Sequence, residues 1–167
     1  MIDLREVIYY EEIEDIIVEI FNQYQWALSR FGMNFDQEIL ETIIYCERDL
    51  ESSLQAFCGW VLTLKEKGET LEQEVLRETF LKAIKEHWQP TFYQQKMLKK
   101  YQDILIKPQD FYWQKAQEFL GDQLRNDLII DITSNGVILY RENVNLNRLS
   151  EEDLNKLTEF KNYLTNF

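Results

Sequence analysis

Few residues in this chain could perform nucleophilic or metal chemistry. There is one histidine, His87, and there are two cysteines, Cys46 and Cys58. A helical di-iron centre needs a Glu-x-x-His motif from each of two helices, and a zinc site needs paired Cys or Cys/His spacing, so neither ligand set can be assembled. The acid-rich segments also lack the Asp-x-Asp-x-Asp-Gly pattern of a calcium loop. The sequence therefore predicts no metal site and no cofactor.

Catalytic motifs are also missing from the sequence. A Cys–His pair would have to use His87, which lies on a different predicted element from either cysteine. The glycines are scattered, so they form no phosphate-binding loop. The 30 acidic residues allow many carboxylate pairs, and an enzyme with an unrecognised carboxylate-based site remains an open alternative. No catalytic residue is predicted.

The segment 82–101, KAIKEHWQPTFYQQKMLKKY, differs from the rest of the chain in charge. The whole chain has a net charge of −12, whereas residues 81–115 carry 7 basic and 3 acidic side chains. Basic side chains interleaved with aromatic rings can bind an acidic protein, or the phosphates and bases of a nucleic acid. The candidate partner-binding residues are Lys85, His87, Trp88, Tyr93, Lys96, Lys99 and Lys100.

Two interpretations of this segment remain open. In the first, its lysines are the solvated faces of two helices that pair with acids of the same fold, and its aromatic rings fill a helix corner at Pro90. In the second, the segment docks an acidic partner, which could be another copy of the chain. The acidic residues 1–80 are likewise either the solvent side of amphipathic helices or a surface for a basic partner.

Nucleic-acid binding is the main alternative function. Residues 90–142 follow the order of a winged-helix element, with two predicted helices followed by a hairpin at Asn135-Gly136. The second of these helices, however, offers only Lys115 and Arg125 against three acids, and the hairpin turn has no basic residue. A helix of net negative charge reads the major groove poorly, which disfavours this alternative.

The elements that position these residues follow from hydrophobic periodicity. Apolar residues spaced by three and four predict a first helix over 5–31, which Gly32 ends. A near-heptad stripe then predicts one long second helix over 36–67, with Asp36 as its N-cap. This helix would carry both cysteines about 18 Å apart, too far for a disulfide.

Capping signals divide the next part of the chain. Thr70-x-x-Gln73 and Thr91-x-x-Gln94 both have the form of a capping box, and they predict the starts of a third and a fourth helix. The fourth should end near residue 106, because the residue before a proline avoids helical geometry. A fifth helix is predicted over 107–127.

The composition of the sequence changes at residue 127. Residues 127–142 are rich in β-branched side chains around Asn-Gly, which predicts a β-hairpin, and NVNLN could add a third, irregular strand. Ser150-x-x-Asp153 then predicts the start of a last helix.

Together these signals predict a mainly α (α+β) fold in a single domain, 1–167. An antiparallel bundle of about five helices (5–126) precedes the β-hairpin (127–142) and a final short helix (150–165). No apolar run is long enough to cross a bilayer, and the acidic N-terminus does not resemble a signal peptide, so a cytoplasmic protein without a membrane partner is predicted. The predicted function is that of a non-catalytic protein–protein interaction module: an adaptor, regulatory subunit or assembly component that binds another protein or forms a homo-oligomer.

Overall fold

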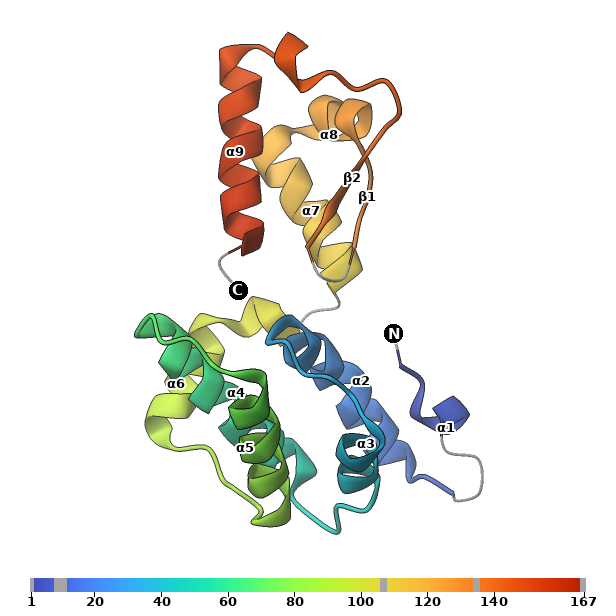
Figure 1. The fold of residues 1–167 in the computed structure, drawn as a ribbon, viewed down its shortest axis with the longest axis vertical. Coiled ribbons are helices and arrows are strands. Elements are labelled where there is room, and N and C mark those ends of the chain that lie inside the picture. The colour runs from blue at the N-terminus through green and yellow to red at the C-terminus, as the bar shows by residue number, and fades with distance from the viewer. Residues whose placement is uncertain (1, 8–11, 106–107, 134–135, 166–167) are drawn as a thin grey trace. The chain divides into compact units, whose positions relative to one another are not determined.

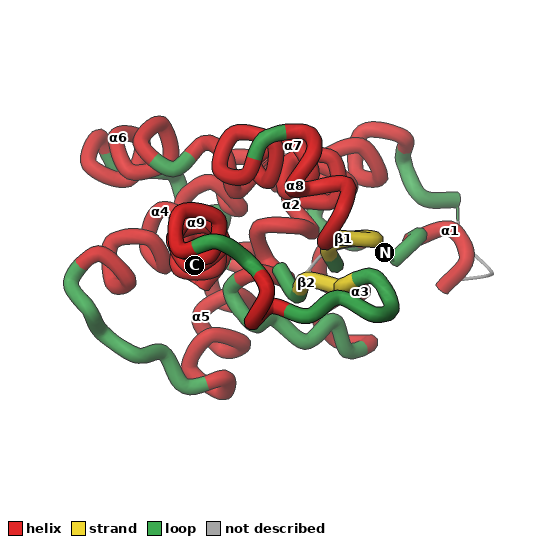
Figure 2. The backbone as a smooth tube through the Cα atoms, turned by 90° about the horizontal axis from the view of Figure 1, so that it is seen from above, coloured by secondary structure: helices red, strands yellow, loops and turns green. Residues whose placement is uncertain are grey.

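The computed structural model describes residues 2–7, 12–105, 108–133 and 136–165. The fold class is as predicted: the chain is mainly helical, with an antiparallel hairpin and a final helix near its C-terminus (Figure 2). It divides into two compact units, the N-terminal unit Met1–Leu105 and the C-terminal unit Ile106–Phe167 (Figure 1). The single domain stays a prediction, because two compact units of one chain can still fold cooperatively.

The regular elements in the described part of the N-terminal unit are all helices. They are α1 (Leu4–Val7), α2 (Asp15–Arg30), α3 (Gln37–Ile44), α4 (Leu50–Glu66), α5 (Gln73–Lys85), α6 (Phe92–Lys100) and the 3-10 helix η1 (Gln102–Leu105). Helix α4 is the centre of the packing, because it contacts α2, α5 and α6. Its Phe57 is fully buried and meets Phe80 of α5 edge to face, with 5.2 Å between ring centroids.

Both long helices predicted from periodicity are interrupted. The helix predicted over 5–31 is wrong at residues 12–14, which lie outside any helix before α2 begins. The helix predicted over 36–67 is wrong at residues 45–49, where α3 and α4 are separate. Asp49 has a left-handed φ of 59°, which breaks helical continuity. Cys46 therefore lies in a connection, on a different element from Cys58, and both thiols are free.

Three predicted boundary signals are confirmed. The side chain of Asp36 accepts a hydrogen bond from the amide of Ile39 at 2.9 Å and caps α3. Thr91 and Gln94 form a reciprocal capping box at the start of α6, with distances of 2.8 and 3.1 Å. Gly32, with a φ of 94°, follows the last turn of α2 in a conformation that costs glycine little.

Two other predicted boundaries differ. Thr70 and Gln73 form no capping box, because α5 begins at Gln73 behind Glu72, whose side chain makes no capping bond. The fourth helix ends at Lys100 rather than near residue 106, and η1 follows it. Residues 106 and 107, near which this end was predicted, lie outside the described residues.

The C-terminal unit combines helices with the hairpin. Its elements are α7 (Pro108–Leu120), α8 (Asp122–Leu128), β1 (Ile129–Ile132), β2 (Ile138–Tyr140), the 3-10 helix η2 (Leu146–Arg148) and α9 (Glu151–Thr165). The predicted fifth helix is divided at Gly121, which has a φ of 81°. The strands pair antiparallel with Ile132 opposite Ile138. The third strand predicted at NVNLN is wrong, because a turn and η2 occupy this stretch.

A separate hydrophobic core supports this unit. Helices α7 and α9 pack together, and β1 closes the core from a third side. Phe160 of α9 is fully buried in this core. At the start of α9, the hydroxyl of Ser150 accepts a hydrogen bond from the amide of Asp153 at 3.1 Å, as the sequence predicts. Leu154 of the same helix is exposed, although it is apolar. Among the described residues, no helix is long and apolar enough to span a bilayer.

Candidate protein-binding surface

The orientation of α6 on α4 decides which candidate residues reach solvent. The two helices approach each other at Gly59, where an added Cβ would lie 2.6 Å from the Cβ of Gln94 and 3.1 Å from its Cα. Only glycine permits so close an approach. Met97, one turn further along α6, is buried. The opposite side of α6 therefore faces outward.

This outward side, the α6 face, consists of Phe92, Tyr93, Lys96 and Lys99. Phe92 is 78% exposed and Tyr93 is 52% exposed, which is unusual for aromatic residues of this size. The ammonium group of Lys96 lies 5.8 Å from the centroid of the Phe92 ring. Helix α6 contains no acid, and no described acid forms an ion pair with Lys96 or Lys99. The α6 face therefore combines exposed aromatic surface with uncompensated positive charge.

Two other candidate lysines are engaged within the fold. The ammonium group of Lys100 lies 3.2 Å from a carboxylate oxygen of Glu66, and this hydrogen bond raises the pKa of Lys100. That of Lys85 lies 3.8 Å from Glu38. These two residues therefore follow the first interpretation of the segment, in which its lysines answer acids elsewhere in the chain.

His87 has a structural position at the end of α5. Its φ is 53°, and its amide and that of Trp88 donate to the carbonyls of Ile84 and Ala83 at 3.2 and 3.0 Å. This is a Schellman motif with histidine in the place that glycine usually takes. Nδ1 of His87 lies 3.1 Å from the carbonyl oxygen of Arg48, which fixes the ring against the α3–α4 connection. Trp88 is half-buried beside this corner.

Cys46 lies near His87, because both side chains contact the carbonyl oxygen of Arg48. The sequence did not predict this proximity. The Cys46 thiol donates to the Arg48 carbonyl at 3.2 Å, and both side chains line a pocket of about 360 Å³ together with Tyr45 and Lys85. Burial raises the pKa of Cys46 above its ordinary value, and nearby carboxylates act in the same direction. The thiol is therefore protonated at neutral pH and is a poor nucleophile. No group of three metal-ligating side chains occurs within the described ranges.

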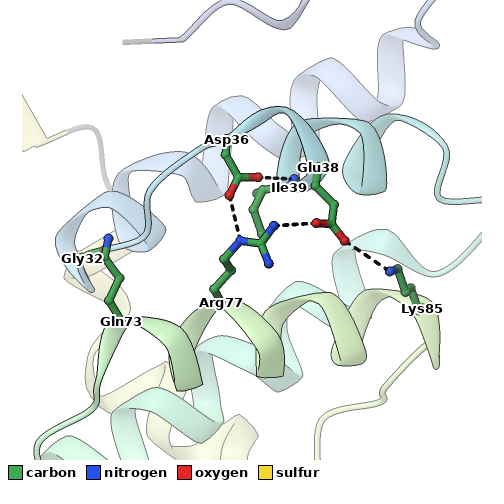
Figure 3. A network of polar contacts seen from close by, with 7 residues as sticks. All are labelled: Gly32, Asp36, Glu38, Ile39, Gln73, Arg77 and Lys85. Carbon is green, nitrogen blue, oxygen red and sulfur yellow. Dashed lines mark hydrogen bonds and ion pairs between the residues drawn. The ribbon is translucent and has the colours of Figure 1, made fainter.

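An ion-pair network next to this pocket joins α3 to α5 (Figure 3). Arg77 of α5 donates to Asp36 at 2.7 Å and to Glu38 at 2.6 Å, and Glu38 also faces Lys85. The hydrogen bond from Arg77 holds the pKa of Asp36 below its ordinary value. Sequence reasoning missed Arg77, because its partners lie 39 and 41 positions earlier. These acids are thus compensated inside the unit.

The structure offers little to a nucleic acid in the winged-helix-like region. The guanidinium group of Arg125 lies 4.4 Å from the centroid of the Trp113 ring and donates to the Trp113 carbonyl at 3.1 Å. Lys115 pairs with Glu118 at 3.0 Å. Arg125 and Lys115, the two basic residues expected to contact DNA, therefore already make contacts within the C-terminal unit. The lysines of α6 belong to the other unit.

Of the seven candidate residues, Tyr93, Lys96 and Lys99 share one exposed face, to which the structure adds Phe92. The others lie at the His87 corner or in internal ion pairs. Phe92 could have been found from its position as the first residue of α6, directly after the capping threonine.

No protein-family model, no curated protein and no solved structure matches the chain.

Proposed function

We propose that the chain is a non-catalytic interaction module that binds an acidic protein partner through the α6 face. The observation that carries this proposal is the coincidence of an exposed phenylalanine with two lysines that no described acid compensates. Removing a Phe side chain fully from water contributes about 1.5–3 kcal/mol to the free energy of binding. Buried aromatic side chains supply much of the binding energy in many protein interfaces. The lysines would steer an acidic surface toward the aromatic anchor.

The remaining charge of the chain favours a protein over a nucleic acid as this partner. With a net charge of −12, the molecule as a whole repels polyphosphates, whereas a local basic face can still attract an acidic protein segment. The module would act as an adaptor, regulatory subunit or assembly component. We place it in the cytoplasm, where its two free thiols stay reduced.

Affinity capture with matched baits tests the proposal. The baits are the wild-type chain, an α6 variant (Phe92→Ala/Lys96→Ala) and an α5 control (Val75→Ala/Lys82→Ala). Val75 and Lys82 are also an exposed apolar residue and an exposed lysine on one helix, so the control loses the same kinds of side chain. Alanine favours helices, so both variants should fold.

The expected result is a set of acidic proteins that the wild type and the α5 control retain from native lysate after nuclease treatment, and that the α6 variant loses. Equal capture by the α6 variant would show that the α6 face does not bind them. Loss of the partners on nuclease treatment would support the nucleic-acid alternative and overturn the proposal.

A further inference from the structure

A second exposed surface of the N-terminal unit has the properties that the α6 face requires in a partner. It lies at the start of α2, and we call it the α2 face: Ile16 with Glu12, Glu14 and Glu19. Ile16 is 53% exposed, although its neighbours Ile13 and Ile17 are buried. All three glutamates are exposed, and no described basic residue forms an ion pair with them. Asp15 adds a fourth carboxylate but pairs with Arg5.

The two faces are complementary in kind. On α6, Lys96 and Lys99 follow the exposed Phe92 by four and seven residues, so one side of the helix carries them in line. On α2, Glu19 follows the exposed Ile16 by three residues, within one helical turn. Each face thus presents one protruding apolar side chain with charges of a single sign beside it, and the signs are opposite.

One molecule cannot form this contact with itself. Within the N-terminal unit, α6 and α1 lie at opposite ends in two perpendicular views (Figures 1 and 2). Arg5 of α1 pairs with Asp15, which places the start of α2 at the α1 end. Helix α4 contacts both α2 and α6 and lies in the packing between them.

We infer that the acidic partner of the α6 face is the α2 face of a second copy, so that the chain associates head to tail. This inference rests on the proposed function and names its partner. The contact joins two different surfaces, so a pair of bound copies leaves one face of each kind free. Such a contact closes into a ring or extends into a chain of copies. The attraction is partly electrostatic and weakens with salt, because the screening length falls from about 8 Å at physiological ionic strength to about 3 Å at 1 M.

Sedimentation velocity of the full chain over a concentration series tests the inference. The variants are the α6 variant (Phe92→Ala/Lys96→Ala) and an α2 variant (Ile16→Ala/Glu19→Ala), with the α5 control (Val75→Ala/Lys82→Ala) beside them. We expect the average mass of the wild type and the control to rise with concentration, and to rise less at high salt. Each of the two face variants should associate at least about tenfold more weakly.

Mixing the two face variants gives the sharpest readout. Each variant keeps the face that the other has lost. At concentrations where each variant alone is monomeric, an equimolar mixture should therefore form a dimer that does not grow further. A mixture that stays monomeric, or wild-type association that neither variant weakens, would overturn the head-to-tail contact. A monomeric wild type whose captured partners still depend on Phe92 and Lys96 would overturn self-association and leave the proposed function standing.

Discussion

Replacing Gly59 by alanine tests the close approach that orients α6. Inside a helix this change ordinarily stabilises by about 0.5–1 kcal/mol, because alanine loses less backbone entropy. Here the new methyl group would lie 2.6 Å from Gln94 Cβ and 3.1 Å from its Cα, so the backbone of α6 must move. Overpacking of this kind costs about 1–3 kcal/mol. The steric cost is the larger effect, and we expect a net destabilisation of about 1 kcal/mol.

Urea unfolding with a double-mutant cycle measures this effect. With a slope of about 2 kcal/mol per molar, the unfolding midpoint of Gly59→Ala should fall by about 0.5 M. Gln94→Gly removes the Cβ that the methyl group meets, so Gly59→Ala should cost less in that background than in the wild type. The single Gln94→Gly variant accounts for the loss of the capping box. A raised midpoint for Gly59→Ala, or the same cost in both backgrounds, would refute the close approach as its cause.

Three further predictions concern pH, thiol reactivity and cooperativity. Arg77 holds the pKa of Asp36 low, so Asp36 stabilises the fold above its unfolded pKa of about 3.9 and loses this contribution as the pH falls toward and through the lower folded value. Urea midpoints taken between neutral and acidic pH should therefore fall further for the wild type than for Asp36→Asn, and parallel curves would exclude this role. Burial raises the pKa of both thiols, so at neutral pH a thiol reagent should label Cys46 slowly and Cys58 only after unfolding; rapid labelling of native Cys58 would contradict its burial. Phe160→Ala should cost the C-terminal unit about 3–5 kcal/mol and reduce amide protection there while α4 keeps its protection; an equal loss in both units would instead show the single cooperative domain that the sequence predicts.

Hydrophobic periodicity was sufficient to predict the helices but not their breaks. The stripe through Phe57 and Val61 marks the buried side of α4 because burial itself sets that spacing. The break before α4 has no glycine or proline to mark it. It occurs where Asp49 has a left-handed backbone, and the ring of His87 contacts the Arg48 carbonyl of this connection across 39 positions. Such a contact exists only once the chain has folded.

The candidate surface was predictable in charge but not in pairing. Uneven distribution of basic residues was enough to single out the segment that forms α6. The tertiary fold decides which lysines form an ion pair. Glu66 at the end of α4 pairs with Lys100, and Glu38 of α3 pairs with Lys85. The outward side of α6 depends in turn on Gly59, which the sequence pattern did not mark as a contact.

The position of α9 in the core of the C-terminal unit has a consequence for biosynthesis. Leu157, Phe160 and Leu164 of this helix fill that core against α7 and β1, and they are translated after the residues of α7 and β1. The N-terminal unit draws its core from residues that emerge earlier, so it can fold while translation continues. A ribosome that stalls before residue 150 would release a chain whose N-terminal unit is complete. Its C-terminal unit would lack α9, so the apolar residues of α7 and β1 would be exposed. Chaperones and proteases recognise such exposed apolar segments, so the C-terminal unit is protected from them only once α9 has been made and packed.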